Sequence, residues 1–94
     1  MTQLNEMQVR LLNHIEDEMD MIIYLRRKYD LSFKLYSRLN ELLYQQEAVL
    51  TGNFLFEKIK LSENRVMANV YFDNSTSLTC QYVENQEGKN IANN

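Results

Sequence analysis

The apolar residues change their spacing near residue 51, and this change divides the chain into two parts. Up to residue 50 they recur at steps of three and four, which is the spacing of one face of an α-helix. After Gly52 they alternate with polar residues, which is the spacing of a β-strand. The pattern therefore predicts an α+β protein in which helices come first and strands follow.

The first apolar stripe predicts a helix over about residues 3–29, because no glycine or proline interrupts this segment. The stripe has gaps at Gln8 and Glu18. Carboxylates also crowd residues 16–20, so the pattern leaves open whether the segment forms one helix or two. The positions that carry the stripe are Leu4, Leu11, Ile15, Ile22, Leu25 and Tyr29.

A second stripe predicts a helix over about residues 32–50. Asp30 or Ser32 can cap its free amide groups. Gly52 follows its last apolar residue and is the expected left-handed residue beyond a helix end. Short connections make a helical hairpin the simplest arrangement of the two helices.

Three alternating runs follow, at about residues 54–61, 66–72 and 78–83. Polar turns at residues 62–65 and 73–76 separate them, which favours a three-stranded antiparallel β-meander over about residues 54–83. One face of this sheet should pack on the helices. We expect Phe33, Tyr36, Phe56 and Phe72 to lie in the core.

The 94 residues are enough for a single domain, which we place at residues 1–84, with a mobile tail over residues 85–94. A domain of this size buries a modest core, so a homodimer is possible. No stretch approaches the roughly 20 apolar residues that cross a bilayer. One cysteine and no visible signal peptide suggest a cytoplasmic protein without contact to membranes.

The residues that most enzymes use are scarce in this chain. His14 lies in a predicted helix and Cys80 in a predicted strand, where a small core residue is the ordinary interpretation. We find no glycine-rich phosphate loop, no H-E-x-x-H and no C-x-x-C. The sequence therefore predicts no catalytic residues, no metal ligands and no cofactor.

Charged and aromatic residues form three candidate binding groups. The acidic group is Glu16, Asp17, Glu18 and Asp20, and the basic group is Arg26, Arg27, Lys28, Lys34 and Arg38. Either group can be an ordinary solvated surface, and cations also stabilise the end of a helix. The candidate exposed aromatic residues are Tyr24, Tyr44 and Tyr71.

Two functions fit these patterns. The first is a small non-enzymatic protein-interaction module, such as an inhibitor, adaptor or regulator of a larger bacterial or phage machine. Its net charge of −3 suits a protein that mimics or blocks a nucleic-acid-binding surface. The second is a DNA-binding regulator that resembles a winged helix-turn-helix, with residues 31–47 as recognition helix and residues 54–72 as wing. Lys34 and Arg38 would then face the DNA.

Overall fold

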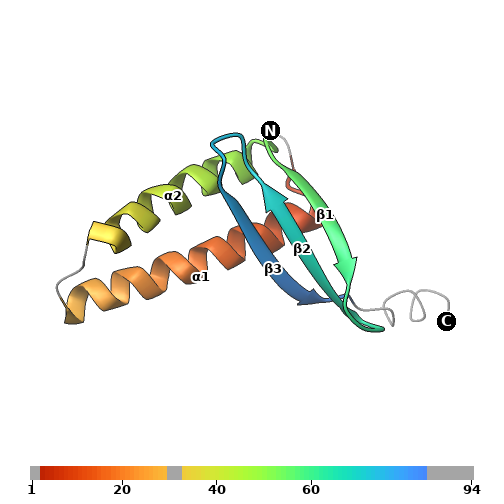
Figure 1. Cartoon of the computed structure of the whole chain (residues 1–94), viewed down its shortest axis with the longest axis horizontal. Helices are drawn as coiled ribbons and strands as arrows, with labels where there is room; N and C mark the ends of the chain where they lie inside the picture. The colour runs from red at the N-terminus through yellow and green to blue at the C-terminus, as the bar shows by residue number, and fades with distance from the viewer. Residues whose placement is uncertain (1–2, 30–32, 85–94) are drawn as a thin grey trace.

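The computed structural model describes residues 3–29 and 33–84 and confirms the predicted α+β order (Figure 1). Helices α1 (Glu6–Lys28) and α2 (Phe33–Leu50) precede strands β1 (Leu55–Lys60), β2 (Arg65–Tyr71) and β3 (Ser77–Val83). The predicted capping residues Asp30 and Ser32 and the predicted tail at residues 85–94 lie outside the described residues. No helix in the described ranges is long and apolar enough to cross a membrane.

Helix α1 is continuous through the acidic stretch, so the segment that the sequence left open as one helix or two forms a single helix. The helix begins later than predicted because Asn5 caps it. The Asn5 side chain accepts a hydrogen bond from the Gln8 amide at 2.8 Å, and the Gln8 side chain accepts one from the Asn5 amide at 2.9 Å. This capping box satisfies two amide groups that the first turn leaves unpaired.

Helix α2 ends at Leu50, and the predicted left-handed residue beyond the helix end is Gly52. Gly52 has a φ of 74°, in the left-handed region that side chains disfavour. Its amide donates to the Val49 carbonyl at 3.1 Å, and the Asn53 amide donates to the Ala48 carbonyl at 2.8 Å. These two bonds form a Schellman motif, which stops the helix and turns the chain toward β1.

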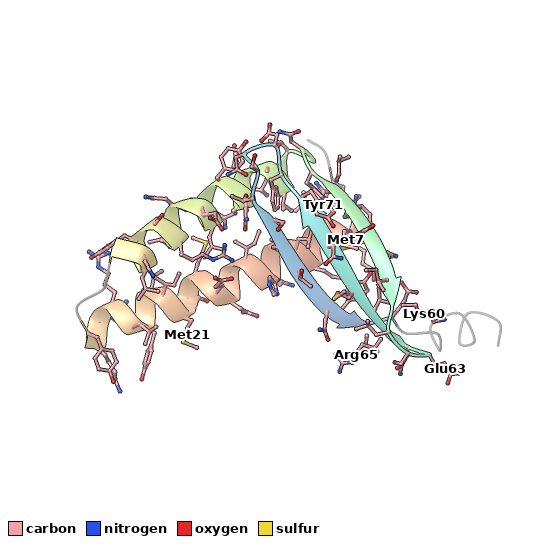
Figure 2. The ribbon with its side chains drawn as sticks, in the orientation of Figure 1. Met7, Met21, Lys60, Glu63, Arg65 and Tyr71 are labelled. Atoms are coloured by element: carbon pink, nitrogen blue, oxygen red, sulfur yellow. The ribbon has the colours of Figure 1, made fainter. Side chains whose placement is uncertain are left out.

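The three strands form an antiparallel sheet in the order β1-β2-β3. Leu55 pairs with Tyr71 across β1 and β2, and Val70 pairs with Leu78 across β2 and β3. The sheet crosses one side of the helical hairpin near the N-terminus of α1 (Figure 1). The other half of the hairpin extends past the sheet, and Figure 2 shows Met21 on this uncovered part of α1.

One hydrophobic core joins both helices to β2 and β3. Its buried side chains are Leu11, Ile15, Ile22, Leu42, Ala48, Val49, Ala68, Val70, Phe72, Leu78 and Cys80. Phe72 therefore occupies the core as predicted. Two other predictions are wrong, because Tyr36 is 44% exposed and Phe56 is 45% exposed. The Phe33 side chain lies outside the described part of the structure.

Candidate functional site: the exposed edge of the sheet

Strand β1 is exposed at all six positions, whereas β2 and β3 bury alternate residues in the core. Its apolar residues Leu55, Phe56 and Ile59 are 75%, 45% and 39% exposed. The alternation in the sequence assigned each side chain of β1 to one face of the sheet. In the structure, the helices leave the side chains on both faces of β1 exposed. Apolar exposure of this kind on a sheet edge is typical of a binding surface.

The backbone of β1 also presents hydrogen-bonding groups that have no partner among the described residues. The Leu61 amide donates to the carbonyl of Arg65, the residue opposite, at 2.9 Å. In an antiparallel pair, residues that exchange such bonds alternate with residues whose amide and carbonyl groups point away. The register therefore directs the backbone groups of Phe56, Lys58 and Lys60 away from β2. They form the free edge of the sheet.

Two hollows lie beside Phe56, on the side of β1 that faces the hairpin. The larger, of about 590 Å³, lies between the start of α1 and the end of α2 and is lined by Asn5, Gln8, Leu50, Thr51, Gly52, Phe54 and Phe56. The other, of about 540 Å³, is lined by Glu6, Met7, Arg10, Phe56, Lys58, Tyr82 and Glu84. A segment placed along β1 would have room for side chains in both hollows.

Charged groups border the second hollow. The Arg10 guanidinium lies 4.2 Å above the centre of the Tyr82 ring and forms an ion pair with Glu6 at 2.6 Å. Lys58 reaches across β2 to Glu84, with 3.3 Å between the ammonium nitrogen and the carboxylate oxygen, and this hydrogen bond raises the pKa of Lys58. Figure 2 shows Lys60 at the tip of the β1–β2 hairpin, beyond the helices.

The structure connects the predicted acidic and basic groups through Glu18 and Arg38. The Arg38 guanidinium binds the Glu18 carboxylate through two bonds, of 2.5 and 2.9 Å, and also contacts Glu41. The hydrogen bond from Arg38 lowers the pKa of Glu18, and Glu18 raises the pKa of Arg38. These two residues therefore link α1 to α2.

The remaining charged candidates stay on the surface, where their role in binding is still a prediction. Glu16, Asp17 and Asp20 are exposed on α1. The exposed basic candidates are Arg26, Arg27 and Lys28 of α1 and Lys34 of α2. The Lys28 ammonium lies 5.4 Å from the centre of the Tyr24 ring, which is within the range of a cation–π contact.

The three candidate aromatic residues are exposed but lie on three different elements. Tyr24 is on α1, three residues beyond Met21, which Figure 2 shows on the part of α1 that extends past the sheet. Tyr44 on α2 donates a hydrogen bond to Asp73, and Tyr71 on β2 donates one to Glu57 at 3.0 Å. These bonds raise the pKa of both phenols and lower that of Asp73. The tyrosines therefore do not form a single patch.

His14 lies on α1 and Cys80 on β3. Cys80 is buried in the core cluster, and burial raises the pKa of its thiol, which disfavours the reactive thiolate. Within residues 3–29 and 33–84, no group of three or more His, Cys, Asp or Glu side chains is placed to hold a metal ion.

The sequence did not predict two buried polar residues that connect the helices to other parts of the fold. Gln8, which interrupts the first stripe, is buried and donates to the Val49 carbonyl at 2.8 Å. Gln45 is buried too and donates to the Thr76 hydroxyl at 3.2 Å, although its Oε1 has no partner in the described structure. The Asn5-x-x-Gln8 spacing was the signal that could have identified Gln8.

Comparisons with protein-family models, curated proteins and solved structures give no match.

Proposed function

We propose that this chain is a non-enzymatic protein-interaction module whose β1 edge binds an extended segment of a partner protein. The observation that carries this proposal is the exposure of β1 at all six positions, together with its free backbone edge. An extended segment that adds to such an edge gains main-chain hydrogen bonds, and pockets beside the edge select its alternate side chains.

The surroundings of β1 define the chemistry of the segment. Side chains on the hairpin-facing side would lie beside Phe56 and enter the two hollows. The larger hollow has no charged residue in its lining and favours apolar side chains, whereas the lining of the second hollow is mostly charged and favours polar ones. Lys58 and Lys60 share that side of the strand by alternation. Both charges discourage indiscriminate pairing of edges. Lys58 already pairs with Glu84, so Lys60, which forms no ion pair with a described residue, is the charge that favours a segment with Asp or Glu. The expected ligand is therefore an extended segment whose hairpin-facing side chains, at every second residue, are apolar beside Phe56 and acidic beside Lys60.

The ion pairs of Arg38 favour a protein ligand over nucleic acid. The winged-helix alternative needs Lys34 and Arg38 to contact DNA, but Arg38 already binds Glu18 and Glu41. A winged helix-turn-helix would also divide the first predicted helix into two shorter helices, whereas α1 is one continuous helix. A module of the proposed kind would act as an inhibitor, adaptor or regulator by occupying a segment of its partner.

A substitution at Lys58 tests the free edge directly. Lys58→Pro removes an amide that points away from β2, so the β1–β2 hydrogen bonds remain. Lys58→Thr is the matched control, because it removes the same lysine and keeps the amide. Affinity capture from a lysate of the source organism should recover one specific protein with wild type and Lys58→Thr, and lose it with Lys58→Pro.

Two results would contradict the proposal. One is that the wild type recovers no specific protein, or that Lys58→Pro and Lys58→Thr recover it equally well. Circular dichroism must show that both variants are folded. The other is sequence-specific binding of duplex DNA by the wild type, measured by fluorescence anisotropy. If Lys34→Glu with Arg38→Glu removed that binding without loss of stability, the DNA-binding alternative would take precedence.

A further inference from the structure

The tip of the helical hairpin, which we define as residues 24–29 together with Lys34, carries a charge opposite to that of the rest of the chain. Residues 21–37 hold four lysines or arginines and one aspartate, which is a net charge of +3. The whole chain has a net charge of −3, so its other residues carry −6. The tip lies at the end of the hairpin that extends past the sheet (Figure 1). The molecule is therefore polarised, with a basic tip and an acidic body.

The cations of the tip are exposed and are not engaged by the carboxylates of the described residues. They are Arg26, Arg27, Lys28 and Lys34, and none forms an ion pair with another described residue. The nearest described carboxylate along α1 belongs to Asp20, six to eight residues before the cations of that helix, which is about 9–12 Å along its axis. This distance exceeds the Debye length of about 8 Å at physiological salt. The positive charge of the tip is therefore available to attract an anion.

Helix stability explains only part of this cluster. Arg26, Arg27 and Lys28 lie in the last turn of α1, where cations interact favourably with the helix dipole. Lys34 is the second residue of α2, and the first turn of that helix holds no acidic residue. A cation near the N-terminus of a helix is unfavourable for the same reason, so the dipole does not account for Lys34. Positive charge is thus gathered from two helix ends although it destabilises one of them, which indicates a ligand at the tip.

The three cations of α1 surround the end of the helix. Arg26, Arg27 and Lys28 are consecutive, and consecutive residues lie about 100° apart round a helix, so the three side chains leave it on three different sides. A linear ligand, such as an extended peptide or a nucleic-acid strand, runs along one face and does not contact all three. A flat surface that meets the tip end-on does contact them all, because the long side chains of lysine and arginine can bend toward it. The arrangement therefore favours a flat anionic surface over a linear polyanion.

Exposed tyrosines accompany the cations of the tip. Tyr29 is 64% exposed and directly follows the end of α1, and Tyr24 is 52% exposed one turn before that end. The cation–π contact between Lys28 and Tyr24 keeps a positive charge beside an aromatic ring. Tyrosine has an apolar ring and a polar hydroxyl group, which suit the boundary between lipid headgroups and acyl chains. Basic residues interleaved with aromatic ones are typical of a surface that binds an anionic membrane.

We propose that the hairpin tip docks end-on to a membrane surface rich in anionic lipids. The sequence predicted no contact with membranes because no segment is long enough to cross a bilayer, but docking to the surface needs no such segment. Each lysine or arginine at an anionic surface strengthens binding roughly fivefold, and the acidic body is repelled from the same surface, so the tip alone makes contact. This inference goes beyond the proposed function, because the docked chain keeps its β1 edge free to bind a partner.

Charge reversal on each helix tests the end-on contact. The wild type should co-sediment with vesicles of phosphatidylcholine and phosphatidylserine but not with vesicles of phosphatidylcholine alone, and added salt should weaken the binding. Arg27→Glu on α1 should lower the partition coefficient roughly tenfold or more, since it replaces an attracted charge with a repelled one. Lys34→Glu on α2 should lower it similarly, although an acidic residue in the first turn stabilises that helix. A loss of binding without a loss of stability in Lys34→Glu separates the two effects.

The matched control is Arg65→Glu, which makes the same charge change at an exposed arginine that Figure 2 shows at the end of the sheet away from the tip. It should leave vesicle binding nearly unchanged. The proposal is overturned if the wild type binds neither kind of vesicle or both kinds equally, if Arg65→Glu weakens binding as much as Arg27→Glu, or if Lys34→Glu binds like the wild type. Preference of the wild type for a single-stranded oligonucleotide over the mixed vesicles, measured by competition, would also overturn it and assign the tip to nucleic acid. Circular dichroism of each variant separates loss of binding from loss of the fold.

Discussion

Gln8 and Val49 join the first turn of α1 to the last turn of α2, because the side-chain nitrogen Nε2 of Gln8 donates a hydrogen bond of 2.8 Å to the Val49 carbonyl. The same glutamine completes the capping box with Asn5. One side chain therefore starts a helix and holds the open end of the hairpin together. The structural role of Gln8 can be separated into these two contributions by substitution.

Gln8→Met should lower the free energy of unfolding by about 1–3 kcal/mol, because it removes a capping contact and a buried hydrogen bond while keeping the volume. Asn5→Ala should cost about 1 kcal/mol, because it removes the cap alone. Urea unfolding of both variants measures the difference. Equal costs for the two variants would show that the bond to Val49 adds nothing.

Glu18→Gln should destabilise the protein in a pH-dependent way. Glu18 has a pKa below its ordinary value of 4.5 in the folded state, so the unfolded state binds more protons as the pH falls. The stabilisation is therefore present above pH 4.5 and is lost as the pH falls through the folded pKa. Both side chains of the pair are about a third exposed, so solvent limits its contribution to about 0.5–1 kcal/mol at pH 7.

Unfolding experiments from neutral to acidic pH measure this dependence. The stabilities of wild type and Glu18→Gln should converge well below pH 4.5. Asp17→Asn is the control, because Asp17 is exposed and forms no ion pair among the described residues. A constant difference between wild type and Glu18→Gln at every pH would show that the Glu18 charge is not responsible.

Gly52→Ala should cost about 1–2 kcal/mol through the backbone alone, because Gly52 has a φ of 74°. A Cβ at this position would meet the Gln8 side chain at 3.9 Å, which is an ordinary contact, so a clash adds nothing. Gly52→Asn should cost less, since asparagine tolerates the left-handed region. Thermal unfolding would contradict this explanation if alanine and asparagine were equally costly.

Cys80 should resist thiol reagents in the folded protein. It is buried in the core, and burial raises its pKa, so little thiolate is exposed to react. Labelling with a chromogenic disulfide should therefore be slow in buffer and rapid in concentrated urea. Rapid labelling in buffer, at the rate seen in urea, would mean that β3 opens readily or that the thiol is exposed.

The hydrophobic pattern predicted the elements because burial imposes a period of 3.6 on α1 and α2 and a period of two on β2 and β3. It could not predict the exposure of β1, because alternation assigns a side chain to a face without showing whether anything covers that face. Phe56 was placed in the core for this reason. The interruptions at Gln8 and Glu18 resembled defects in a stripe, yet each forms a bond to a residue far along the chain. These partners depend on how α1 and α2 pack against each other, and the spacing of apolar residues along the sequence carries no information on that packing.

The free edge of β1 is the basis of the proposed binding function, and amide hydrogen exchange measured by NMR tests this edge residue by residue. In the chain alone, the amides of Phe56, Lys58 and Lys60 should exchange much faster than those of Glu57 and Ile59, which bond to β2. Addition of the partner protein recovered with the Lys58→Thr variant should protect Phe56, Lys58 and Lys60 together. Protection confined to the helices, or unchanged exchange along β1, would contradict the proposal that this edge is the binding site.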